Sequence, residues 1–102
     1  MYIIVKELEI IGDKKRSMVR SLFDSGASDL VLREHIAEGA ASFSRLSESA
    51  NLLPGCGKRT VTSEYFTGIG SVLEECTFPA QRVLIVDELD DERILRGDAF
   101  QK

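Results

Sequence analysis

Apolar and polar residues alternate along much of this chain with the two-residue period of β-strands. Residues 2–11 are rich in isoleucine and valine in rough alternation with charged positions, which predicts a first strand. Residues 12–15, Gly-Asp-Lys-Lys, supply turn formers, and a second strand is expected from about residue 16 to residue 23. The N-terminal quarter of the chain is therefore predicted to be a β-hairpin.

The middle of the chain mixes short extended and helical patterns. Residues 30–32 are apolar and expected to be extended, and a short helical turn is expected near residues 33–38. The stretch 39–51 is small and polar, and its pattern leaves helix and loop both open. Residues 53–58, Leu-Pro-Gly-Cys-Gly-Lys, predict a tight turn, because glycine tolerates positive φ and proline presets its own φ.

The C-terminal part again has the composition of strands. Residues 59–86 are β-rich, with breaks expected at Gly-Ile-Gly, residues 68–70, and at Pro79-Ala80. An acidic loop, residues 87–92, leads to a last apolar stretch at 94–100. Short strands punctuated by glycine predict a mostly β protein, a small closed or nearly closed barrel with one or two short helices.

Length and charge limit the classes of function. A chain of 102 residues is expected to form one domain, residues 1–102. Its 43% hydrophobic and 29% charged residues are typical of a folded, water-soluble protein. A net charge of -4 leaves no basic stripe with which to displace counterions, so no nucleic-acid partner is expected.

Targeting features and metal-ligand patterns are missing from the sequence. No apolar segment is long enough to span a bilayer, and the start of the chain lacks the parts of a signal peptide. We therefore expect a cytoplasmic protein without a membrane partner. Two cysteines, one histidine and no Cys-x-x-Cys pair predict neither a disulfide framework nor a zinc site, and no metal or cofactor is expected.

The most informative segment delivers a carboxylate at the end of an apolar strand. Leu22 and Phe23 are followed by Asp24, Ser25 and Gly26, after which an apolar run resumes. Gly26 allows close backbone approach, and Ser25 can hydrogen-bond locally to hold the turn. One interpretation is an exposed acid on a rigid turn, and the other is an Asx-turn that caps a strand without any catalysis.

The sequence around this turn resembles the active-site motif of retropepsin-like aspartic peptidases. Residues 22–32 match hydrophobic-hydrophobic-Asp-(Thr/Ser)-Gly-(Ala/Ser) followed by an apolar strand. Residues 53–58 are similar to the tip of the flap that closes over substrate in this family, with residues 67–70 as a second candidate. Residues 94–100 resemble the second signature of the family, which packs beside the aspartate loop. The resemblance implies the acid-protease barrel topology.

The resemblance also implies a site and a reaction. It makes Asp24 the catalytic residue, supported by Ser25 and Gly26, in a homodimer where each subunit contributes one aspartate to hydrolyse a peptide or protein substrate. It further implies a set of substrate-binding residues: Ala27, Ser28, Asp29, Gly55, Cys56 and Gly57.

Two departures from the family pattern keep a second function open. Arg96 stands where the family has glycine, and its side chain is expected to crowd the aspartate loop unless the backbone shifts. The chain stops at Lys102, where the family usually continues into a strand of the dimer interface, so residues 1–7 or another edge are expected to form it. The alternative function is a non-catalytic retropepsin-like module that dimerises or binds peptides.

The remaining candidate side chains are expected to have structural roles. His35 is expected on the surface of the short helix, and Cys76 is expected to be a small buried hydrophobe within a strand. Tyr65 and Phe66 are expected to pack in the barrel.

Overall fold

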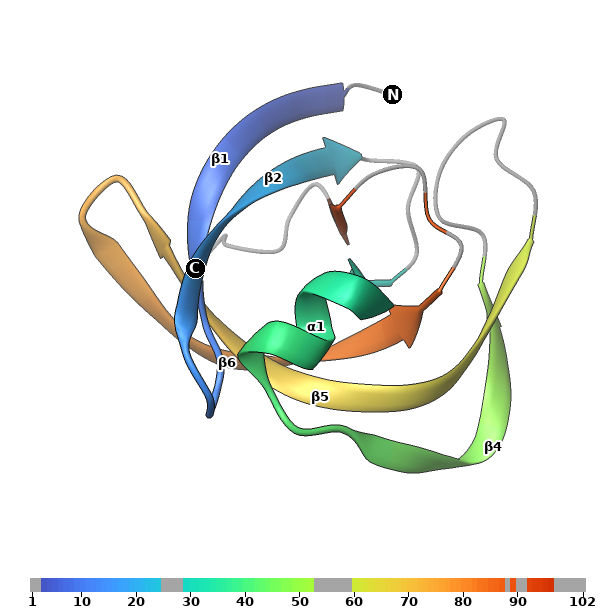
Figure 1. The fold of residues 1–102 in the computed structure, drawn as a ribbon. Coiled ribbons are helices and arrows are strands. Elements are labelled where there is room, and N and C mark those ends of the chain that lie inside the picture. Colours follow the sequence, from blue (N-terminus) through green and yellow to red (C-terminus); the bar gives the residue numbers. More distant parts are fainter. Residues whose placement is uncertain (1–2, 25–28, 53–59, 88, 90–91, 97–102) are drawn as a thin grey trace.

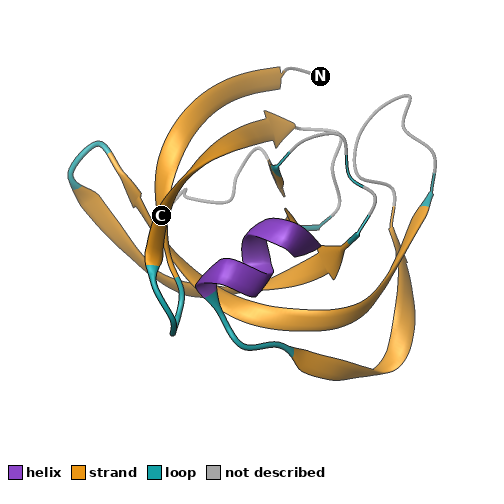
Figure 2. Ribbon diagram, in the orientation of Figure 1, coloured by secondary structure: helices purple, strands orange, loops and turns teal. Residues whose placement is uncertain are grey.

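The described part of the chain forms seven strands and one short helix (Figures 1 and 2). A computed structural model describes residues 3–24, 29–52, 60–87, 89 and 92–96. Along the chain the elements are β1 (Ile3–Ile11), β2 (Arg16–Asp24), β3 (Val31–Arg33), α1 (Glu34–Ala40), β4 (Ser44–Leu52), β5 (Val61–Leu73), β6 (Cys76–Val86) and β7 (Arg93–Arg96).

Six of these strands close into a barrel. Neighbouring strands follow the order β1-β2-β7-β3-β6-β5, and the ring closes because Glu9–Ile11 of β1 pairs with Gly70–Val72 of β5. The remaining strand, β4, lies outside the ring and pairs with the first half of β5. The prediction of a small, mostly β, closed barrel with a short helix is confirmed.

The N-terminal hairpin forms as predicted. β1 and β2 pair antiparallel from Ile3–Asp24 to Ile11–Arg16, and the Gly12 N–H donates to the Lys15 carbonyl at 3.1 Å across the turn. Leu8 and Ile10 are buried in the barrel, whereas Ile4 is 46% exposed although the alternation groups it with them. The pairing with β5 reaches only to Glu9, so it leaves the start of β1 uncovered.

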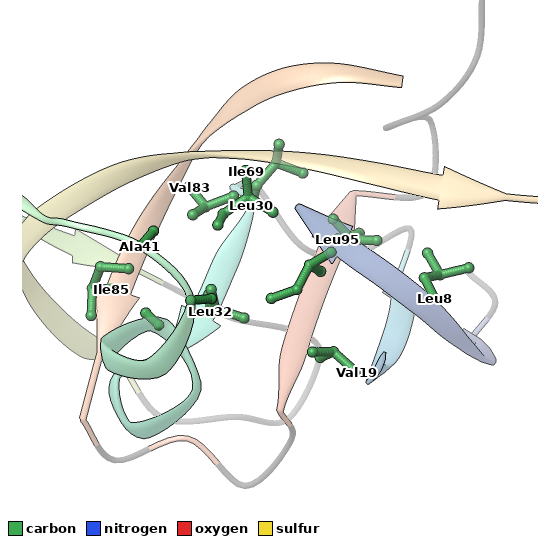
Figure 3. Packing of buried hydrophobic residues seen from close by; sticks show 12 residues of the cluster. Leu8, Val19, Leu30, Leu32, Ala41, Ile69, Val83, Ile85 and Leu95 are labelled. Atoms are coloured by element: carbon green, nitrogen blue, oxygen red, sulfur yellow. The ribbon is translucent and has the colours of Figure 1, made fainter. Parts of the chain in front are cut away.

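β3, β7 and the last four residues of β6 contribute buried side chains to both faces of the sheet, which produces two hydrophobic clusters. In β6, Val83 and Ile85 point into the barrel, and Leu84 and Val86 point to its outside, as the strand period requires. The first group, here called the barrel core, contains Leu8, Ile10, Val19, Leu30, Leu32, Ala37, Ala40, Ala41, Ile69, Val83, Ile85 and Leu95 (Figure 3). The second group, here called the outer cluster, contains Val31, Leu52, Leu84, Val86, Leu89 and Ile94.

The predicted breaks in the C-terminal β-structure were wrong. β5 runs without interruption through residues 68–70, and β6 runs through Pro79-Ala80. The ladder between these strands shifts register between Ile69 and Ser71, so these glycine and proline residues mark a β-bulge instead of a turn. The true turn is Glu74-Glu75, where both residues adopt positive φ (50° and 70°).

Residues 39–51, whose pattern left helix and loop both open, contain the end of α1 and most of β4. α1 confirms the helical turn expected near residues 33–38, and only three residues separate Ala40 from the start of β4 at Ser44. The Ala40 carbonyl accepts a hydrogen bond from the Lys14 N–H at 2.9 Å, and the Ser42 N–H donates to Asp13 Oδ1 at 2.7 Å. These bonds fix the end of the helix against the β1–β2 turn, where the glycine at position 12 gives the Ala40 carbonyl room.

The expectations for four single residues have mixed outcomes. His35 is exposed on α1 and Tyr65 packs against the barrel core, both as expected. Phe66 packs against the outer cluster, so its predicted position in the barrel was wrong, because its side chain points to the opposite face of β5 from that of Tyr65. Cys76 is exposed, so its predicted burial was wrong. It opens β6 directly after the Glu74-Glu75 turn, where the strand protrudes beyond its neighbours.

Candidate active site

Asp24 is the last residue of β2 and is 3% exposed. Side chains alternate along β2: Val19 and Phe23 contact the barrel core, and Leu22 contacts the outer cluster. Asp24, two residues after Leu22, therefore faces the same side as the outer cluster. The strand places its carboxylate at the rim of the barrel, beside an apolar surface and largely shielded from water.

The C-terminal strand β7 runs alongside the end of β2. The two strands pair in parallel, with Leu22 opposite Ile94 and Asp24 opposite Arg96. The register continues through Arg96, whose side chain is exposed. The paired residues of β2 and β7 therefore show no backbone shift of the kind that would move Arg96 away from the aspartate turn. The Cα atoms of Arg96 and Asp24 lie about 5 Å apart, which is one strand spacing.

Asp29 lies on the other side of β7. β3 pairs antiparallel with β7, with Val31 opposite Ile94. Asp29 precedes Val31 by two residues and lines the same cavity as Arg96, which is opposite Asp24 on β2. Asp24, Arg96 and Asp29 thus form a row across three neighbouring chain segments, although they are far apart in the sequence.

A β-hairpin rises from the same apolar surface. β4 and β5 pair antiparallel up to Leu52 and Val61, and both residues pack against the outer cluster together with Leu22 of β2. The chain between these strands contains the predicted flap tip. The other flap candidate, residues 67–70, is excluded because it lies inside β5 and pairs with β6.

The structure describes two of the predicted site residues. Asp24 is buried at the end of β2, and Asp29 is half-buried. The other predicted site residues lie outside the described residues: Ser25, Gly26, Ala27, Ser28, Gly55, Cys56 and Gly57.

An open cavity of about 250 Å³ adjoins the row of charged residues. Its lining consists of Asp29, Leu30, Arg82, Leu84 and Arg96. Arg82 was not among the predicted site residues, because nothing in its local sequence distinguishes it from other charged positions on a strand. It comes from β6 and reaches the site only through the pairing of β6 with β3.

A buried arginine inside the barrel was also missed. Arg93 is fully buried, and its Nη2 donates to Ser71 Oγ at 2.8 Å. Burial lowers the pKa of the Arg93 guanidinium from its ordinary value to about 10, because the charged form loses its hydration. Position 93 follows an acidic loop in the sequence, and that local context favours an exposed arginine over a buried one.

Comparisons with protein-family models, with curated proteins and with solved structures found no match for this chain. Within the described ranges, no group of three or more His, Cys, Asp or Glu side chains is arranged to hold a metal ion. The described part of the chain also has no helix that is both long and apolar enough to cross a membrane.

Proposed function

We propose that this chain is one subunit of a homodimeric, retropepsin-like aspartic peptidase in which Asp24 is the catalytic residue. The observation behind the proposal is the position of Asp24, a carboxylate that is 3% exposed at the end of β2 beside β7. Two further features support it. The stretch that resembles the second family signature begins on β7, next to this carboxylate, and the β4–β5 hairpin shares the outer cluster with Leu22.

The chemistry requires two carboxyl groups. Hydrolysis of an amide by water, with neither a metal nor a covalent nucleophile, needs a carboxylate that takes a proton from the water and a carboxylic acid that polarises the carbonyl. Two carboxyl groups about 3 Å apart cannot both ionise, so they share one proton. The chain contains a single Asp-Ser-Gly sequence, and a two-fold axis supplies the second Asp24 from the partner subunit.

The two Asp24 carboxyl groups hold the attacking water between them. Ser25 braces the two aspartate turns across the axis, and Gly26 lets the backbone approach the substrate. The substrate is an extended peptide held by β-type hydrogen bonds, over which the connection between β4 and β5 closes. Because the second carboxyl group supplies the acid, the reaction uses neither a metal nor a cofactor.

Cleavage of a mixed peptide library by the purified protein tests the proposal. Asp24→Asn is expected to lower turnover about 100-fold or more, since it removes the shared proton and the base. Asp13→Asn is the matched control, because Asp13 is exposed in the turn before β2 and at the opposite end of that strand from Asp24.

Sedimentation in parallel measures the oligomeric state, which the proposal requires to be a dimer. Undiminished cleavage by Asp24→Asn, or a wild-type protein that cleaves as a strict monomer, would contradict the proposal. A dimer that binds peptides without cleaving any of them would instead indicate the non-catalytic module.

A further inference from the structure

The cavity beside Asp29 has the size and lining of a pocket for one side chain. Its volume of about 250 Å³ is below the range of about 300–1,000 Å³ that is typical of pockets for whole small ligands. Leu30 and Leu84 supply apolar walls, and the polar groups are two guanidinium groups and one carboxylate. Such a lining suits a side chain with an apolar stem and a charged end.

The charges of the lining do not balance. The lining carries two guanidinium groups, those of Arg82 and Arg96, and one carboxylate, that of Asp29, so its formal charge is positive. Arg82 forms no ion pair with any residue in the described ranges. Its Cζ lies 5.0 Å from the centroid of the Phe66 ring, a cation–π contact that holds the guanidinium in place. The cavity thus presents a positioned cation on a chain whose net charge is -4.

We propose that this cavity is a specificity subsite that accepts an acidic side chain, aspartate or glutamate, from the peptide substrate. The proposal rests on the proposed peptidase function and adds a substrate preference to it. The carboxylate of the substrate binds the guanidinium of Arg82, whose planar fork matches a carboxylate. The aliphatic part of the same side chain packs on Leu30 and Leu84.

The preference applies to one position of the substrate. Side chains of an extended peptide alternate between two faces, so a single residue reaches a pocket one or two strands away from Asp24. A lysine at that position would face two guanidinium groups, and a glutamine would keep the shape but lose the charge. The subsite therefore distinguishes glutamate from glutamine and lysine.

The test compares cleavage of one peptide in three forms. The best-cleaved peptide of the library is resynthesised with Glu, Gln or Lys at the position where acidic residues are enriched, and kcat/KM is measured for each. Wild type is expected to prefer Glu over Gln roughly tenfold or more, as for a hydrogen bond between charged groups. Arg82→Gln is expected to abolish this preference, and Arg82→Glu to shift it toward Lys.

Arg45→Gln is the matched control. Arg45 is also an exposed arginine over an aromatic ring, 5.6 Å from the centroid of Tyr65, and it does not line the cavity. The variant is expected to keep the wild-type preference for Glu. An acidic preference that survives in Arg82→Gln, or the absence of any preference in an active wild-type enzyme, overturns the subsite and leaves the peptidase proposal intact.

Failure of the peptidase proposal is separated from failure of the subsite by a binding measurement. If wild type cleaves nothing, binding of fluorescent peptide pools with free or amidated acidic side chains is measured by polarisation for wild type and Arg82→Gln. Tighter binding of the acidic pool that depends on Arg82 supports the subsite without the peptidase. Equal binding of both pools overturns it.

Discussion

Replacing Arg93 by methionine removes a positive charge from the interior of the barrel. The methionine side chain is similar in length and apolar, and the surrounding cluster is hydrophobic. Arg93 is fully buried and donates to Ser71 Oγ at 2.8 Å. The single variant therefore removes a costly buried charge, and it also removes the hydrogen-bond donor to the buried hydroxyl group of Ser71.

The size of the expected change in stability follows from the pKa of Arg93. A tenfold change in the acid dissociation constant corresponds to about 1.4 kcal/mol, so a pKa lowered from the ordinary arginine value to about 10 means that the buried charge costs about 3 kcal/mol at neutral pH. Leaving Ser71 without its donor costs about 1–3 kcal/mol, which offsets much of this gain. The double variant Arg93→Met/Ser71→Ala avoids that cost, and its free energy of unfolding is expected to exceed that of wild type by about 1–4 kcal/mol.

The effect also has a pH dependence. The folded-state pKa, about 10, lies below the pKa of arginine in the unfolded chain, so the unfolded chain binds more protons at pH values between the two. The stability contributed by this group therefore rises with pH across the window, and the advantage of the double variant shrinks there.

Urea unfolding followed by circular dichroism measures these differences. Arg16→Met is the control, because Arg16 is exposed and pairs with Glu9 on the surface, so a change within about 0.5 kcal/mol is expected. A double variant less stable than wild type at neutral pH would refute the reasoning and show that the guanidinium stabilises the barrel.

Two further predictions concern the junction of α1 with the β1–β2 turn. Gly12→Ala is expected to lower the free energy of unfolding by about 1–3 kcal/mol, because the added Cβ would overlap the Ala40 carbonyl oxygen. Gly68→Ala, whose Cβ would meet its nearest neighbour at 3.7 Å, is the control, and equal melting temperatures for the two variants would argue against the close approach. The hydrogen bond from the Ser42 N–H lowers the pKa of Asp13 below 3.8, so its stabilising effect is present above that pH and is lost as the pH falls through the folded-state pKa. Asp13→Asn is expected to lack this loss of stability at acidic pH. If the unfolding midpoints of wild type and Asp13→Asn change identically with pH, the prediction is wrong.

Local patterns were sufficient for most of the strands. The alternation in residues 2–11, the turn formers at 12–15 and the apolar run at 30–32 each correspond to an observed element. Alternation and turn chemistry are properties of neighbouring residues, so a single sequence displays them. The turn at Glu74-Glu75 was missed because glutamate is not a turn former, and the pairing of β5 with β6 forces both residues to positive φ.

The residues of the candidate site also fall into two groups, those that a local sequence pattern marks and those that only the fold brings together. The sequence alone marked Asp24, since a carboxylate followed by serine and glycine at the end of an apolar strand is a local pattern. Only the tertiary structure placed β2, which ends at Asp24, and the chain segment around Asp29 on either side of β7, which ends at Arg96, and brought Arg82 to the same cavity. Strand order and register join residues more than fifty positions apart, and no short-range periodicity records which strands pair. Burial of Arg93 was decided by the closure of the barrel, which surrounds its side chain with the other strands.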